Sequence, residues 1–221
     1  MSHNYFITGT DTDCGKTEIT LGLMQRLRNR GLSVLGMKPV ASGAVTTAYG
    51  PRNDDAVRIR QQASEMVDYD LINPFAYAPP IAPHLAAEQV GREIDFWQIR
   101  ACYQTLESQA ESVIVEGVGG WQVPLGKDQA VSDLAKLLEL PVILVVGLKL
   151  GCINHALLSA ESIVASGVKL AGWVANVADE NMLEPEGNLE TLKQRIDAPL
   201  LGFVPRLEQP TPEAVAGFLL L

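Results

Sequence analysis

Six short apolar runs alternate with helical patterns along the 221-residue chain. The runs are rich in Val, Ile and Leu and rarely alternate with polar positions, which is typical of strands buried on both faces of a parallel sheet. They cover residues 5–8, 33–39, 112–116, 141–146, 169–176 and 200–205. Helical patterns follow near 17–30, 54–65, 95–109, 131–139, 153–166 and 186–196. This order predicts a doubly wound α/β fold over residues 1–221, with a mostly parallel sheet and helices on both faces.

The first apolar run leads into a loop that ends in Gly-Lys-Thr. Gly9 and Gly15 flank the loop, and five residues separate them instead of the usual four. Glycine lets backbone N–H groups approach phosphate oxygens, and the start of a helix adds free donors and positive potential. A strand, such a loop and a helix therefore predict a phosphate site. Lys16 would reach the β- and γ-phosphates of a nucleotide, and Thr17 would contact Mg²⁺.

Charged residues stand at the ends of the second and third runs, where a parallel sheet binds its ligands. Lys38 is either an exposed lysine at a strand edge or a cation that faces the phosphate loop. Glu116 is either an exposed carboxylate or the Mg²⁺-directed acid of a second nucleotide motif, and the glycines behind it favour the motif. Asp54 and Asp55 open a helical pattern, where they would cap the helix or help to hold Mg²⁺. The sequence leaves this last choice open.

Later strand ends offer weaker candidates. The fourth run leads to glycines and another helix start at Gly151, which is either an anion site or an ordinary loop. Asn176 ends the fifth run, and its amide can both donate to and accept from an adenine edge. The loop at 205–207 would line the same base pocket. Residues 68–92 are Pro-rich and weakly periodic, which predicts an irregular and functional segment.

Composition restricts the partners. The chain is 47% hydrophobic and 19% charged with a formal net charge of −9, which is typical of a globular protein and unfavourable for nucleic acid or anionic membranes. No apolar stretch approaches the ~20 residues of a spanning helix. Three cysteines without metal-ligand spacing predict free thiols in a reducing cytoplasm.

Taken together, these motifs resemble the dethiobiotin synthetase family of ATP-dependent enzymes nearly from end to end. The resemblance rests on seven stretches: Gly9-Thr10-Asp11-Thr12-x-x-Gly15-Lys16-Thr17, Lys38-Pro39-Val40-x-Ser42-Gly43, Asn53-Asp54-Asp55, Val115-Glu116-Gly117-x-Gly119-Gly120-Trp121, Gly147-x-x-x-Gly151-Cys152-Ile153-Asn154-His155, Gly172-Trp173-Val174-Ala175-Asn176 and Ala198-Pro199-Leu200-Leu201-Gly202. The lengthened phosphate loop is this family's own form. The resemblance implies a P-loop NTPase fold. It also implies closure of a ureido ring on 7,8-diaminononanoate from CO₂ and ATP with Mg²⁺.

The resemblance also assigns roles to residues. Lys16 and Lys38 would be catalytic, and Thr17, Asp55 and Glu116 would hold Mg²⁺. Thr12 and Ser42 would touch the diamine, whose carboxylate would bind at Gly151, Cys152, Ile153 and Asn154 of the partner in a homodimer. The nucleotide would contact Asp13, Cys14, Gly15, Lys16, Thr17, Glu18, Asp55, Glu116, Gly117, Val118, Gly119, Asn176, Val177, Pro205, Arg206 and Leu207.

Two departures from the family pattern concern the substrate. Asp13 stands where many relatives carry Glu, and residues 184–190 lack the Tyr that some relatives place against the substrate carboxylate. Both leave open a related diamine as substrate. A rival interpretation is a dimeric P-loop ATPase that regulates a protein partner, but no basic or amphipathic membrane tail supports it.

Overall fold

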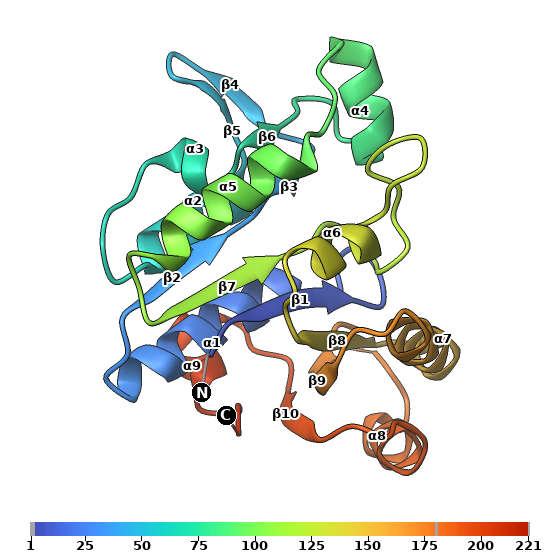
Figure 1. Ribbon diagram of the computed structural model, residues 1–221. Helices are drawn as coiled ribbons and strands as arrows, with labels where there is room; N and C mark the ends of the chain where they lie inside the picture. Colours follow the sequence, from blue (N-terminus) through green and yellow to red (C-terminus); the bar gives the residue numbers. More distant parts are fainter. Residues whose placement is uncertain (1–2, 180, 221) are drawn as a thin grey trace.

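The computed structural model describes residues 3–179 and 181–220. Within these residues, six strands form one sheet in the order β10-β9-β8-β1-β7-β2, and every adjacent pair is parallel (Figure 1). The strands are β1 (Tyr5–Gly9), β2 (Val34–Met37), β7 (Ser112–Glu116), β8 (Val142–Leu148), β9 (Leu170–Val177) and β10 (Leu200–Val204). All six coincide with the predicted runs. Every residue of β7 and β8 is buried, which explains the unbroken apolar sequence of β8 and the apolar centre of β7.

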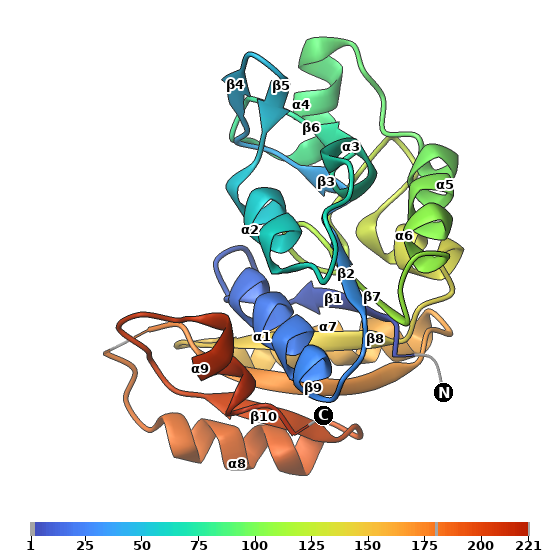
Figure 2. The same ribbon diagram turned by 90° about the vertical axis from the view of Figure 1, so that its left-hand side faces the viewer.

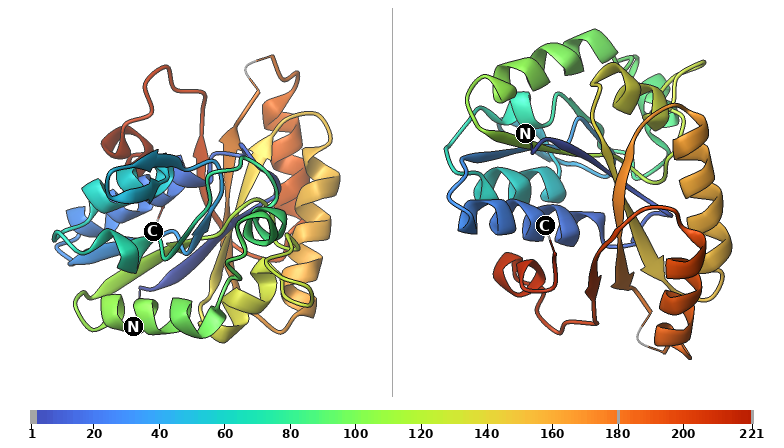
Figure 3. Two further views of the ribbon diagram at one scale, coloured as in Figure 1. Left: turned by 90° about the horizontal axis from the view of Figure 1, so that it is seen from above. Right: turned by 60° about the horizontal axis from the view of Figure 1, so that its bottom comes forward.

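Helices cover both faces of this sheet (Figures 2 and 3). One face carries α1 (Lys16–Asn29), α2 (Asp54–Gln62) and α9 (Pro212–Ala216). The other carries α5 (Phe96–Glu107), α6 (Val131–Leu137) and α7 (Cys152–Ala165), and α8 (Pro185–Arg195) packs against α7. This arrangement confirms the doubly wound α/β fold, and the six predicted helices are all present.

Several short elements escaped prediction. Residues 68–92, expected to be irregular, contain α3 (Tyr69–Ile72), β6 (Phe75–Ala76) and α4 (Pro83–Val90), and that expectation was wrong. Pro83 stands at the start of α4, where its fixed φ suits a helix and no N–H is needed. The strand β6 pairs with β3 (Val40–Ala41) over two residues, which is too short to leave a pattern. A hairpin of β4 (Val45–Thr47) and β5 (Gly50–Arg52) projects beside them.

The topology gathers the candidate residues at one edge of the sheet. The strand β1 lies between β7 and β8, and β2 pairs with β7 on its other side. Because all these strands are parallel, the loops after β1, β2 and β7 emerge side by side. The phosphate loop, Lys38 and Glu116 belong to these three loops or strand ends.

Candidate functional site

The loop after β1 has the geometry of a phosphate cradle. Gly15 caps α1 in the left-handed region with φ of 90°, and no side chain caps the helix. Asp13 is also left-handed, with φ of 58°. Together they turn the chain sharply, so that the free N–H groups at the start of α1 face the cavity beyond the loop. A Cβ added to Gly15 would overlap the Asn176 amide, so this position requires glycine.

Lys16 is 7% exposed and folds back over its own loop. Its Nζ donates to the Asp11 backbone oxygen at 2.8 Å. That acceptor is a neutral carbonyl, which holds the ammonium less strongly than a charged phosphate oxygen would. Lys16 is therefore placed over the loop with a partner that it can exchange for phosphate.

Lys38 lies directly after β2 and is 4% exposed. Its Nζ donates to Asp55 Oδ2 at 3.1 Å, to Glu116 Oε1 at 2.5 Å and to the Gly117 carbonyl at 3.3 Å. Glu116 is fully buried. The interpretations of Lys38 and Glu116 as exposed residues at strand ends are therefore wrong, because each is the buried partner of the other.

Charge stabilisation dominates this cluster. Burial lowers the pKa of Lys38, but attraction to Glu116 and Asp55 and hydrogen bonds to both outweigh it, so the pKa lies above its ordinary value. Burial likewise raises the pKa of Asp55, whereas Lys38 and a hydrogen bond with Thr17 bring it below its ordinary value. The Lys38 ammonium and the Asp55 carboxylate are therefore both charged at neutral pH.

The same cluster fits a magnesium ion. Thr17 Oγ1 donates to Glu116 Oε1 at 2.9 Å, and Asp55 contacts both Thr17 and Lys38. These are oxygen ligands, which Mg²⁺ prefers. Glu116 Oε2 is buried and has no hydrogen-bond partner among the described residues, so one acceptor is unsatisfied. The described chain contains no group of three or more His, Cys, Asp or Glu that could hold a metal. Such a group is unnecessary where nucleotide phosphates and water complete the shell.

Asn53 takes the capping role that the sequence left open for Asp54 and Asp55. The Asn53 side chain accepts from Ala56 N at 3.3 Å and caps α2. Neither aspartate is needed for this cap. Asp55 instead forms an ion pair with Lys38, and its role as a metal ligand stays a prediction.

A cavity of about 770 Å³ connects the loop with the cluster. It has room for a nucleotide triphosphate tail and a small substrate. Most of the predicted phosphate, metal and diamine residues line it: Thr12, Asp13, Gly15, Lys16, Thr17, Glu18, Lys38, Ser42, Asp55, Glu116, Val118 and Gly119. Sequence reasoning had assigned no role to several others, namely Ala41, Asn53, Arg58, Pro80, Ile81, Ala82, Pro83 and Val123. For residues 80–83, the Pro-rich sequence was the only signal of a functional segment.

Two predicted nucleotide contacts beside the cavity have their side chains occupied. The Glu18 carboxylate accepts two hydrogen bonds from Arg58, at 2.7 and 2.8 Å. The Cys14 side chain is 2% exposed, and its carbonyl accepts from Asn176 Nδ2 at 3.0 Å. Nucleotide contacts at Glu18 and Cys14 would therefore use backbone N–H groups.

The predicted adenine residues lie across the phosphate loop from the cavity. Asn176 and Val177 end β9, which pairs with β8 at Gly147 and Leu148. Residues 205–207 follow β10, whose Val204 pairs with Asn176. These strand ends thus share an edge, with the Asn176 amide hydrogen-bonded to the loop that it adjoins.

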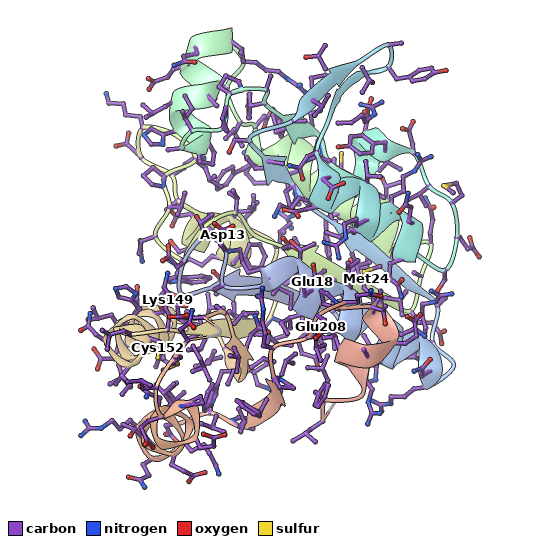
Figure 4. All side chains as sticks on the ribbon, turned by 180° about the vertical axis from the view of Figure 1, so that it is seen from behind. Asp13, Glu18, Met24, Lys149, Cys152 and Glu208 are labelled. Carbon is purple, nitrogen blue, oxygen red and sulfur yellow. The ribbon has the colours of Figure 1, made fainter. Side chains whose placement is uncertain are left out.

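The predicted carboxylate site lies at the start of α7, outside this cavity. Gly151 caps the helix with φ of 93°, Cys152 is buried, and Ile153 and Asn154 are at least partly exposed. Figure 4 shows Cys152 close to Lys149, whose Nζ lies 2.6 Å from Asp11 Oδ2 of the phosphate loop. The Tyr-less stretch at 184–190 is next to this region, because it begins α8, which packs on α7.

Searches against known proteins identify close relatives. Residues 3–214 match a family model described as an AAA domain. The ATP-dependent dethiobiotin synthetase BioD of Pseudomonas aeruginosa (strain UCBPP-PA14) is 54% identical over 216 residues, which cover 97% of this chain and 95% of the relative. The protein of the same name from Aromatoleum aromaticum is 51% identical over 217 residues, covering 98% and 96%.

Solved structures share the fold at low identity. The cell division protein MinD of Aquifex aeolicus superposes with a TM-score of 0.58 at 14% identity, covering 97% of this chain and 93% of that one. MinD of Pyrococcus horikoshii, solved with Mg-ADP, gives 0.55 at 16% identity, covering 97% and 86%. These matches confirm the P-loop fold and, at such identities, nothing further. No helix among the described residues is long and apolar enough to cross a membrane.

Proposed function

The chain belongs to the ATP-dependent dethiobiotin synthetases, ligases of biotin biosynthesis that close a ureido ring, and from this premise we propose how its cavity serves that reaction. The main support is the pair of salt bridges from Lys38 to Asp55 and Glu116. These residues line the same cavity as Lys16 and Thr17. This places two cations and an oxygen-ligand set around one space. Phosphoryl transfer needs such a set, because its transition state is anionic.

The chemistry proceeds in three steps. One amine of 7,8-diaminononanoate attacks CO₂ and loses a proton, which leaves a carbamate. A carbamate oxygen attacks the γ-phosphorus of ATP, and the bond to ADP breaks to give a carbamic–phosphoric anhydride. The second amine attacks the carbonyl carbon of this anhydride, the ring closes, and phosphate leaves. The protein's task is to position these groups and to stabilise their charge.

Lys16 and Lys38 carry the stabilisation from two sides. Lys16 exchanges the Asp11 carbonyl for the β- and γ-phosphate oxygens. Thr17, Asp55 and Glu116 would hold Mg²⁺, which supplies positive charge to the phosphate oxygens when bound. Lys38 shares both carboxylates with this set, and its ammonium stabilises the negative charge of the carbamate. Thr12 and Ser42 line the same cavity and contact the diamine.

The base of the nucleotide binds at the ends of β9 and β10. Asn176 uses one N–H for the Cys14 carbonyl, which leaves a second N–H and the amide oxygen for an adenine edge. Val177, Pro205, Arg206 and Leu207 complete this pocket. It adjoins the phosphate loop directly, as one bound ATP requires.

A homodimer with the substrate at its interface completes the proposal. The carboxylate of the diamine binds the helix start at Gly151, Cys152, Ile153 and Asn154 of the partner subunit. Support comes from large apolar side chains exposed on and near α7, since Leu150 is 96% exposed and Leu158 is 57% exposed. Analytical ultracentrifugation of the chain and of Leu158→Glu tests this, and a monomeric wild type would contradict it. The free thiols of Cys14, Cys102 and Cys152 suit the cytoplasm.

Labelling tests the reaction itself. The chain is incubated with radiolabelled bicarbonate, ATP, Mg²⁺ and 7,8-diaminononanoate, and we expect acid-stable label in the ureido product. Lys38→Met should lower kcat about a hundredfold or more, whereas Lys127→Met, which removes an exposed lysine, should not. ATP hydrolysis at a rate independent of the diamine, with no acid-stable label in the product, would contradict the ligase proposal. That result would favour the regulatory-ATPase interpretation. Diamines one methylene shorter or longer test the preference that Asp13 leaves open.

A further inference from the structure

Arg58 makes a two-pronged ion pair outside the residues assigned above. Its two terminal nitrogens lie 2.7 Å from Glu18 Oε1 and 2.8 Å from Glu18 Oε2. The two side chains are 32% and 25% exposed, so the pair is partly shielded from water. A bidentate guanidinium–carboxylate contact fixes orientation as well as distance, which a single hydrogen bond does not.

This pair connects the starts of two helices that each carry a proposed metal ligand. Glu18 directly follows Thr17 in α1, and Figure 4 shows it on that helix. Arg58 lies three residues after Asp55 in α2, so the two side chains share one face. The pair therefore restrains the two helices on which the Thr17 hydroxyl and the Asp55 carboxylate lie.

At the same end of α2, a hydrogen bond between Asp55 and Thr17 also joins the two helices, and it has a single prong. The far end of the helix is tied to α1 by Gln62 Nε2, which donates to Gln25 Oε1 at 2.7 Å. Near the cavity, the Asp55 side chain is 37% exposed and forms a salt bridge with Lys38. Lys38 also forms a salt bridge with Glu116. The guanidinium of Arg58 adds the two-pronged contact between the N-terminal parts of the two helices.

We propose that Arg58 is a positioning residue for the magnesium site: by holding Glu18, it sets the spacing of Asp55 and Thr17 that Mg²⁺-nucleotide binding needs. This inference rests on the proposed metal set of Thr17, Asp55 and Glu116. It also gives Glu18 a structural task in place of a side-chain contact to nucleotide.

Nucleotide binding without turnover tests the inference. Fluorescently labelled ADP is titrated into the full chain with Mg²⁺ or with EDTA, and bound Mn²⁺ is followed by electron paramagnetic resonance. We expect Arg58→Met and Arg58→Lys to weaken Mg²⁺-dependent ADP binding and Mn²⁺ binding about tenfold to a hundredfold, because lysine cannot make the two-pronged contact. Binding in EDTA should stay unchanged. Arg60→Met is the matched control, since Arg60 lies on the same helix and donates to the Val67 carbonyl instead.

Four results would overturn the inference. Equal weakening in Mg²⁺ and EDTA would show that Arg58 serves the phosphates or the fold. Wild-type ADP and Mn²⁺ binding in Arg58→Lys would show that a positive charge suffices without the two-pronged contact to Glu18. Unchanged Mg²⁺-dependent ADP binding in Arg58→Met, together with a large loss of that binding in Asp55→Asn, would exclude a role for Arg58. The proposed metal ligands would still stand. A wild type whose ADP binding ignores Mg²⁺ would instead refute the metal set itself, and the inference with it. Urea midpoints of all variants verify that each is folded.

Discussion

Replacing Lys38 with methionine tests the buried charge cluster most directly. Methionine fills a similar volume without charge, so the substitution leaves Glu116 buried beside no cation. Glu116 is fully buried and the Lys38 side chain is 5% exposed, so water cannot replace the lost partner. Asp55 is 37% exposed at its side chain and is screened more easily. The cost therefore comes mainly from Glu116.

The expected loss is large relative to total stability. Removing one partner of a buried ion pair costs about 3–5 kcal/mol, out of a total of about 5–15 kcal/mol for a domain. With a urea slope of about 2–3 kcal/mol/M, this lowers the midpoint by about 1–2 M. Adding Glu116→Gln to Lys38→Met removes the unpaired charge. The double variant should therefore recover about 2 kcal/mol or more of the loss.

Equilibrium urea unfolding, followed by circular dichroism at neutral pH in EDTA, measures all four members of this cycle. Additional Mg²⁺ should stabilise Lys38→Met more than wild type, because a metal ion can replace the missing ammonium between Asp55 and Glu116. The reasoning fails if the two substitutions are additive within about 0.5 kcal/mol. In that case, the unpaired Glu116 carboxylate would not be the cause of the instability.

Three further predictions concern single positions. Gly15→Ala should lose about 1–2 kcal/mol of stability from its left-handed φ and also most ATP binding, because its Cβ would overlap the Asn176 amide; Gly31→Ala has a similar φ of 87° and open space, so it should lose stability alone. Asn176→Ala should weaken ATP binding about tenfold in calorimetric titration, and unchanged affinity would exclude it from the adenine site. Burial raises the pKa of Tyr77 to about 12, and its hydroxyl donates to the Arg92 carbonyl. The resulting stability is complete below pH 10 and is lost as pH rises towards 12; Tyr77→Phe should therefore show a flatter decline than wild type in urea midpoints measured across that range, and identical slopes would contradict the assignment.

The sequence alone determined the larger elements of this protein. Mostly apolar runs marked the strands of the parallel sheet, because a strand buried on both faces has few polar positions. Gly15-Lys16-Thr17 marked the phosphate loop, because the close approach of backbone to phosphate restricts the residue types. These are local properties, set by residues near one another in the chain. The short pairing of β3 with β6 left no such pattern, and neither did the two-turn helix α4.

Only the tertiary structure decided how the site is assembled. Lys38 and Glu116 are 78 residues apart and meet because β2 pairs with β7. From sequence, an exposed position remained an alternative for each of them. The order of strands determines which loop ends meet, and that order depends on contacts distant in sequence. The Arg58–Glu18 ion pair could not be predicted from the sequence for the same reason. The two residues are 40 positions apart and meet only because α1 and α2 pack together.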